Sequence, residues 1–325
     1  MPSLKEIKTR IASVNSTRKI TSAMKMVASS KLHHAQQMIE NMLPYETELD
    51  HILKTFLESA ENLTSDYELE HKQVSKVAIV VFTSNSSMCG GFNANIIRLL
   101  QQVIDEYTEQ VGRENILIYP IGRKVYDKVK KLGFVPQGEY NKLCEKPNPQ
   151  GCGALAGQLM ADFIDHKIDK VEMLYHHFRS TASLIVTREQ YLPIDVSNDI
   201  LNRKNRDLSR VDSSKAAMDY LNNKGAEAEL LNEDFKPSMV PNVDFIVEPS
   251  VDDVLEKLIP QALHLKMYTA FLDSNACEHA ARMIAMQTAT DNADELLREL
   301  NLQYNKSRQQ AITSELLDIV GGSQN

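Results

Sequence analysis

The sequence predicts an α/β domain, Rossmann-like in its strand and helix order, between two long helices that pair as an antiparallel coiled coil. Glycine is confined to the middle of the chain: the first of twelve is Gly90, nine fall between Gly90 and Gly157, and none occurs from 226 to 320. Apolar residues at both ends follow heptad spacing, whereas short apolar runs alternate with amphipathic stretches in between. Helical arms therefore flank a domain with a mainly parallel sheet.

The N-terminal helix is expected within residues 1–62. Neither Gly nor Pro occurs from Ser3 to Leu43. The apolar residues there alternate three and four apart, as in the seam of a coiled coil: Leu4, Ile7, Ile11, Val14, Ala28, Leu32, Ala35, Ile39 and Met42. Three polar residues, Arg18, Thr21 and Lys25, interrupt this seam. The basic, Ser-rich composition is also typical of a transit peptide, but such a peptide has no need of a sustained heptad pattern.

The α/β domain is expected within residues 70–202. Val77–Phe82 is a continuous apolar run of strand length, and an amphipathic stretch follows it. We expect strands at Val77–Phe82, Ile116–Tyr119, Val171–Phe178 and Ser183–Leu192, and helices at Asn93–Tyr107, Val125–Leu132 and Ala154–Ile164. Only four residues separate the last two strands, so these two are predicted to form an antiparallel hairpin.

Residues 203–250 are polar and contain Pro237, Pro241 and Pro249, which predicts a partly ordered insertion on the surface. The C-terminal helix is expected within residues 251–325. Residues 261–320 contain neither Gly nor Pro, and Pro260 is expected to start this helix or to kink it against a shorter one at Val251–Ile259.

A helix over residues 261–320 would be about 90 Å long. A compact domain is far smaller, so this helix needs a second long helix beside it, and the N-terminal helix is the candidate. Residues 1–40 carry seven Lys/Arg and two Glu, whereas residues 261–325 carry five Lys/Arg and eight Asp/Glu, so their flanks attract. The alternative is two separate helices that pack on the α/β domain.

The composition argues against several classes of protein. With 36 basic and 44 acidic residues the net charge is −8, which disfavours a general nucleic-acid coat. No run of 18 apolar residues occurs, so no direct membrane span is expected. The four cysteines are scattered, which indicates neither a disulfide framework nor a zinc site. Cys144 and Cys152 are expected to be unpaired thiols, with a reversible disulfide as the alternative.

No catalytic constellation is evident. The loop Thr83–Phe92 follows a strand and opens a helix, where a doubly wound fold binds phosphate, but it lacks a dinucleotide or phosphate-loop fingerprint. A tight turn at Gly90 and Gly91 is the favoured interpretation. The adjacent pairs His33-His34 and His176-His177 diverge in any regular element, so they are expected to be solvated histidines. We expect no enzyme activity and no cofactor.

The end of the C-terminal helix indicates a function more clearly than the loops and histidines do. Its apolar residues point in almost every direction: Ile312, Leu316, Leu317, Ile319 and Val320. A helix that is apolar all round must lie inside something. The chain has no further element to cover it, so a ring or socket of other chains is expected.

Four separated motifs resemble signatures of one family. They are Ile20–Lys31 (ITSAMKMVASSK), Met88–Asn93 (MCGGFN), Glu278–Met286 (EHAARMIAM) with Ala289–Ala293 (ATDNA), and Tyr304–Leu316 (YNKSRQQAITSEL) with Ile319–Gly322. In these motifs, and over nearly its whole length, the chain resembles the gamma subunits of F-type ATP synthases. The resemblance implies a central-stalk rotor of the proton-translocating enzyme, which couples ion flow through the membrane ring to ATP synthesis in the ring of alpha and beta subunits.

The resemblance also implies partners and contact residues. The shaft would lie in the alpha/beta ring, and the α/β domain would lie beside the epsilon subunit and on the membrane c-subunit ring. The complex would be peripheral on the cytoplasmic face of the bacterial inner membrane. The implied contacts with the alpha/beta ring are Lys25, Arg308 and Gln309, and the apolar tip adds Ile312, Leu316, Ile319 and Val320.

The chain departs from the family pattern in two places. Asn85-Ser86-Ser87 replaces the usual Asp-Arg-Gly, which puts a charge contact of that loop in doubt. Residues 203–250 stand where the chloroplast form has a redox insert but contain no cysteine, so dithiol regulation does not carry over. Two other functions stay open: a non-rotating coiled-coil scaffold, and a small-molecule enzyme on the α/β domain.

Overall fold

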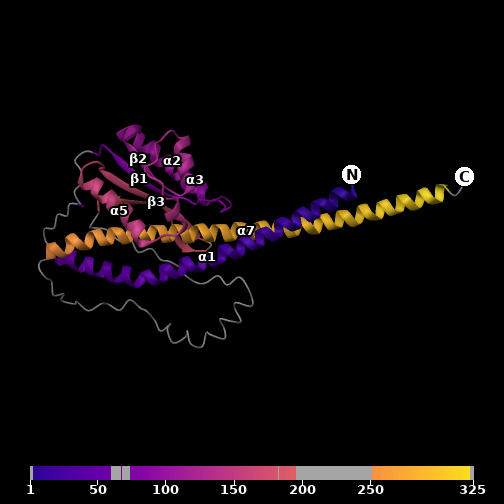
Figure 1. Cartoon of the computed structure of the whole chain (residues 1–325), viewed down its shortest axis with the longest axis horizontal. Helices are drawn as coiled ribbons and strands as arrows, with labels where there is room; N and C mark the ends of the chain where they lie inside the picture. The colour runs from indigo at the N-terminus through magenta and orange to yellow at the C-terminus, as the bar shows by residue number, and fades with distance from the viewer. Residues whose placement is uncertain (1–2, 60–66, 68–73, 182, 195–250, 323–325) are drawn as a thin grey trace, which may run out of the picture. The chain divides into compact units, whose positions relative to one another are not determined.

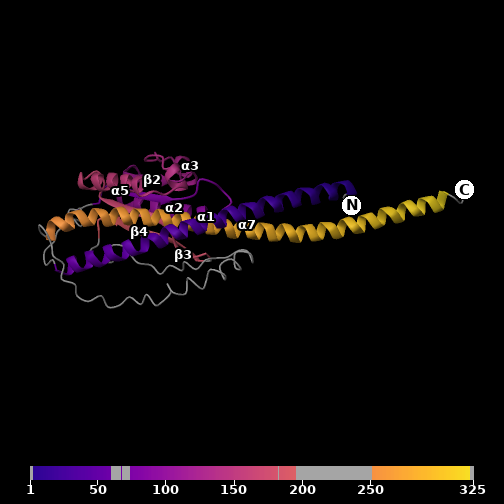
Figure 2. The ribbon, with the colours of Figure 1, turned by 60° about the horizontal axis from the view of Figure 1, so that its bottom comes forward.

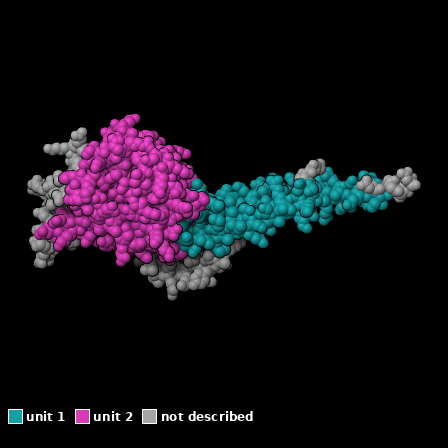
Figure 3. All heavy atoms as spheres, turned by 45° about the horizontal axis from the view of Figure 1, so that its top comes forward, with its two compact units in different colours: residues 1–31, 88–90, 279–325 teal, residues 32–87, 91–278 magenta. Residues whose placement is uncertain are grey.

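A computed structural model describes residues 3–59, 67, 74–181, 183–194 and 251–322. The predicted insertion at 203–250 lies outside the described residues. The chain divides into two compact units (Figure 3). Unit 1 comprises residues 1–31, 88–90 and 279–325, and unit 2 comprises residues 32–87 and 91–278. The long helices α1 (Leu4–Ser59) and α7 (Val251–Gly322) each contribute to both units.

Unit 1 consists mainly of two helical segments that run side by side (Figures 1 and 2). Arg18 of α1 meets Asp294 of α7, and Thr21, three residues later, meets Thr290, four residues earlier. The segments are therefore antiparallel, and the predicted fold class is confirmed.

Both long helices contain a proline. Pro44 lies inside α1, and Pro260 lies inside α7, which begins at Val251 and continues to Gly322. Pro260 therefore does not start the long helix. It removes one backbone hydrogen bond, but neighbouring residues of α7 are buried: Leu255, Ile259, Ala262, Leu263 and Leu265. Tertiary packing of this kind is the main source of helix stability in proteins.

The sheet of unit 2 has the order β2-β1-β3-β4. Its strands are β1 (Val77–Phe82), β2 (Ile116–Ile121), β3 (Lys170–Ser180) and β4 (Ser183–Leu192). β1 pairs in parallel with β2 and β3, and β3 pairs with β4 as the predicted antiparallel hairpin. Every residue of β1 is buried, as expected for a central strand covered on both faces.

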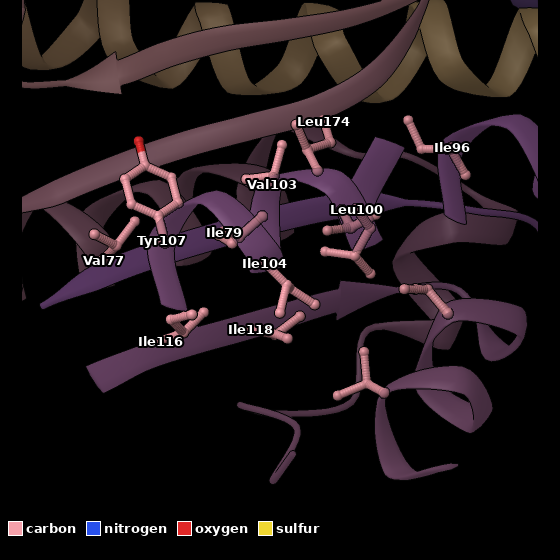
Figure 4. Close-up of a cluster of buried hydrophobic side chains, with 13 residues drawn as sticks. Val77, Ile79, Ile96, Leu100, Val103, Ile104, Tyr107, Ile116, Ile118 and Leu174 are labelled. Atoms are coloured by element: carbon pink, nitrogen blue, oxygen red, sulfur yellow. The ribbon is translucent and has the colours of Figure 1, made fainter. Parts of the chain in front are cut away.

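One face of the sheet packs against α2 (Phe92–Val111) and α3 (Arg123–Lys131). Figure 4 shows this core, in which Val77 of β1 lies beside Tyr107 of α2, and Ile79, Leu100 and Val103 belong to the same cluster. On the other face, the ring centroids of Phe82 of β1 and Phe271 of α7 are 4.7 Å apart. α5 (Pro149–Ile164) lies against α7 there, and two short elements, η1 (Arg113–Asn115) and α4 (Asn141–Glu145), complete the unit.

Candidate partner-binding surface

Two of the three polar residues that interrupt the seam of α1, Arg18 and Thr21, join the two helices of unit 1. Nη1 of Arg18 donates to Oδ1 of Asp294 at 3.1 Å, and the two side chains are 39% and 41% exposed. One turn further, the hydroxyl oxygens of Thr21 and Thr290 are 2.8 Å apart. These pairs could not be predicted from the sequence, because the pattern of one helix does not show which residue of the other helix lies opposite.

Within the part of the chain that the structure describes, the register of the pair leaves the end of α7 without a partner helix. Arg18 faces Asp294, so Leu4, fourteen residues before Arg18, is level with Arg308, fourteen residues after Asp294. α7 continues from Gln309 to Gly322, which is about 20 Å of single helix. Figures 1 and 2 both show α7 running past the N-terminal end of α1.

This single-helix end carries large apolar side chains in contact with water. Ile312, Leu316, Leu317 and Ile319 are 47%, 57%, 66% and 69% exposed. We call the segment 309–322 the tip. Isolated apolar side chains on a surface need no explanation, but a cluster on one short segment is typical of an interaction site.

The structure places the other predicted contact residues on the two helices of unit 1. Arg308 and Gln309 are exposed at the base of the tip, and Lys25 is half-buried at a seam position of α1. Val320 lies in α7, but its side chain is outside the described part. Further exposed apolar side chains were not predicted as contacts: Ile20, Met26 and Val27 of α1, and Leu302 of α7.

The carboxyl end of β1 is filled by side chains of its own loop. Asn93 accepts a hydrogen bond from the backbone N–H of Ser84 at 3.0 Å, and Phe92 stacks on His176 with ring centroids 4.2 Å apart. Gly90 has φ +56°, the left-handed region that favours glycine, as the predicted turn requires. These groups occupy the place where a doubly wound fold holds a phosphate.

The prediction that His176 and His177 are solvated is wrong. Both lie on β3 and are 2% exposed, because helices cover both faces of this strand. His176 points to Phe92 of α2, and burial lowers its pKa to about 4. His177 contacts Asp273 of α7, with 2.7 Å between Nδ1 and Oδ2. His33 and His34 of α1 are exposed, as predicted.

The four cysteines are all buried, and none of them forms a disulfide in the described chain. Burial raises the pKa of the Cys152 thiol to about 12, so this group is not a thiolate nucleophile at neutral pH. The described residues include no cluster of three or more His, Cys, Asp or Glu side chains arranged for a metal ion. Within the same residues, no helix has the length and apolar character to cross a membrane.

An antiparallel helical pair with a bare apolar tip, continuous with an α/β unit, defines a stalk-type subunit of a larger assembly. Comparison with known proteins supports this class. Residues 3–325 match the family model described as ATP synthase. The chain is 54% identical over 323 residues to the ATP synthase gamma chain of Phocaeicola vulgatus and 51% identical to that of Bacteroides fragilis, with 99% of each chain covered. The chain belongs to the ATP synthase gamma chain family.

Solved structures share the fold at low sequence identity. One is the Euglena gracilis mitochondrial ATP synthase in its OSCP/F1/c-ring structure, with a TM-score of 0.60, 19% identity, and 99% of this chain and 93% of that chain covered. The rotor of the same enzyme gives a TM-score of 0.57 at 18% identity, with 95% and 98% covered.

Proposed function

We propose that this chain is the central-stalk rotor subunit of a rotary ATP synthase and that it carries no catalytic group of its own. It would couple ion flow through a membrane ring to ATP synthesis in a ring of alpha and beta subunits. The observation that carries the proposal is the tip, a single helix with exposed apolar side chains beyond the end of its partner helix.

The chemistry of the tip fits a bearing. Apolar contact is non-directional, so a helix that turns inside an apolar sleeve has no set of fixed hydrogen bonds to break at each step. Burial of the four exposed apolar side chains would hold the tip in the sleeve, at about 25 cal/mol for each Å² removed from water. Three of these four, Ile312, Leu316 and Ile319, are proposed contacts, together with Val320.

At the base of the tip the proposed contacts are polar. Arg308 and Gln309 are exposed one turn before Ile312, so they can reach a loop at the mouth of the sleeve. A guanidinium donates several hydrogen bonds in a fixed geometry and can hold a carboxylate or a set of carbonyl oxygens. Lys25 is half-buried at a seam position of α1, and we propose that its ammonium group faces acidic loops of the ring.

An asymmetric shaft gives a three-fold ring its inequivalent sites. Two different helices present different side chains on different sides, so each of three identical nucleotide sites contacts another face of the shaft. A differential contact of this kind shifts the conformational equilibrium of each site. Rotation of the shaft then moves each site through the same sequence of states, while the nucleotide chemistry belongs to the ring.

We propose that unit 2 binds the remaining partners, the epsilon subunit and the membrane c-subunit ring. The assembled enzyme would then lie on the cytoplasmic face of the bacterial inner membrane, with this chain as a peripheral subunit. The filled carboxyl end of β1 is in keeping with a docking domain that binds no nucleotide.

The test is rotation of the reconstituted complex. A bead is attached through a cysteine introduced at the exposed Lys131 of α3, since the four native cysteines are buried. With the alpha/beta ring immobilised, we expect ATP to drive rotation of the bead in one direction. A bead that stays still on a complex that hydrolyses ATP would favour the non-rotating scaffold.

A further inference from the structure

The two helices of unit 1 share a stretch in which α1 contributes few buried apolar side chains. Between Ile7 and Ala28 no side chain of α1 is fully buried, although the heptad spacing continues. The seam positions in this stretch are only half-buried: Ile11, Val14, Arg18, Thr21 and Lys25. On α7, Met286, Ala293 and Leu300 are buried opposite this stretch. The apolar packing therefore comes mainly from α7, and the α1 side constrains the register less than a seam with buried Leu and Ile residues on both helices would.

A heptad seam also permits alternative registers. A slip of one helix by seven residues brings seam positions opposite seam positions again and moves the helix by about 10 Å. Polar residues at seam positions are the usual means by which coiled coils exclude such slips, because only one register pairs them.

We propose that Arg18 is a positioning residue that fixes the axial register of the two helices through Asp294, assisted by the Thr21–Thr290 pair. Nη1 of Arg18 reaches Asp294 at 3.1 Å, while its Nε is enclosed and has no hydrogen-bond partner among the described atoms. The Nε end of the guanidinium is therefore enclosed by the helix pair, while the Arg18 side chain as a whole is 39% exposed. A lost partner would leave a partly desolvated charge there.

The neighbouring residues of α7 disfavour the adjacent registers. A slip of one turn in one direction brings Arg298, four residues after Asp294, level with Arg18, and the two like charges repel. A slip in the other direction brings Thr290 or Asp291 to that level. Asp291 is exposed, and this slip would separate Thr21 from Thr290. A slip of seven residues would bring the uncharged Gln287 or Asn301 level with Arg18.

The register sets the height of the tip relative to α1. In the observed register Leu4 is level with Arg308, so all of segment 309–322 projects beyond α1. A slip of one heptad in one direction would place α1 beside half of that segment. A slip in the other direction would leave two further turns of α7 without α1 beside them. The structural part of the proposal stands on unit 1 alone, whereas its consequence for coupling rests on the proposed rotor function.

The test measures the distance between spin labels on the full-length chain. Labels at Ser13→Cys of α1 and Asn301→Cys of α7 sit on exposed positions of the two helices, and the native cysteines are buried. We expect one narrow distance distribution for the parent chain. Arg18→Asp, which faces Asp294 with a like charge, should broaden the distribution or shift it by several ångströms. The exchange Arg18→Asp with Asp294→Arg should restore the single narrow distribution.

Lys19→Asp is the matched control, because it makes the same change of charge one residue along α1 at an exposed position outside the seam. It should leave the distribution unchanged. An unchanged distribution in Arg18→Asp, or no recovery in the exchanged pair, would overturn the proposal.

Coupling is measured separately in the reconstituted enzyme. We expect Arg18→Asp to lower the ratio of ATP made to ions passed by at least threefold, and the exchanged pair to recover it. A register change with normal coupling would overturn the functional half of the proposal. A parent chain that supports no coupling at all would instead refute the rotor function, and the distance measurement would still decide the register.

Discussion

At the scale of single residues, Arg308 offers the most direct test of the proposed ring contact. It is exposed at the base of the tip, where an arginine can hold two acceptors of a beta-subunit loop. Arg308→Lys keeps the charge but not the planar geometry, and Arg308→Ala keeps neither.

We therefore expect ATP turnover of the reconstituted complex to fall in the order Arg308, Arg308→Lys, Arg308→Ala. A charge-assisted hydrogen bond is worth roughly 1.5–3 kcal/mol, so the alanine variant should lose about tenfold or more if the bond forms in the rate-limiting state. Arg98→Ala on α2, also at an exposed position, serves as the control and should change little. Equal turnover of the three chains would mean that the side chain at 308 is merely solvated.

His176 provides a prediction about pH. Its pKa is lowered to about 4 by burial, whereas an unfolded histidine titrates near 6.5. Between these values the unfolded chain binds a proton that the folded chain does not bind. His176 therefore does not lower the free energy of unfolding of unit 2 above about pH 6.5. That free energy falls as the pH drops from 6.5 towards 4.

We expect His176→Phe, which retains the stacking on Phe92, to reduce this loss by about 2–3 kcal/mol at pH 4.5. Urea unfolding at pH 7 and pH 4.5 measures the effect. His33→Phe, at an exposed position of α1, should leave the pH dependence as it is. A parent chain and a His176→Phe chain with the same pH dependence would contradict the assigned pKa.

The roles of some of these residues could be predicted from the sequence and those of others could not, for physical reasons. Arg308 and the tip residues could be found because an all-round apolar pattern on one helix is a local property. His176 and His177 could not, since burial on both faces of β3 depends on helices distant in sequence. The Arg18–Asp294 pair was hidden for a similar reason: the register between residues 276 positions apart is a tertiary property.

At the scale of elements, the fold was largely predictable from periodicity. β1 and β4 have the predicted bounds, and the hairpin follows from the short connection between β3 and β4. α5 begins at Pro149, five residues before the predicted Ala154, with Asn148 accepting from the N–H of Gly151 at 2.7 Å as its N-cap. The glycines at 151 and 153 concealed this start, although an Asn-Pro pair is a recognised start signal.

The tip is the element whose removal should cost the chain least. Deletion of residues 312–325 removes a segment that has no α1 residue opposite it, so the pairing of α1 with α7 stays intact. We expect the circular dichroism signal to fall only by the share of the deleted residues and the melting temperature to stay the same. A large loss of helix signal would show that the tip belongs to the chain's own core.

At the scale of the whole molecule, the chain combines two units with different surfaces. Unit 1 presents bare apolar side chains at the tip and polar pairs in its seam, and unit 2 encloses a sheet between helices. The proposed function assigns the two units to different partners, with unit 1 for the ring and unit 2 for the foot of the enzyme. This separation yields a prediction about assembly.

One shaft can lie on the axis of a three-fold ring, so native mass spectrometry should find one copy of this chain for three alpha and three beta subunits. Deletion of residues 312–325 should speed dissociation from the ring, because about three turns of apolar helix no longer leave water on binding. The same deletion should leave binding of the epsilon subunit unchanged, since it does not alter unit 2. Two copies of this chain for each ring would contradict an axial shaft and favour a scaffold at the ring's periphery. Loss of the epsilon subunit together with the ring would show that the two units do not bind their partners independently.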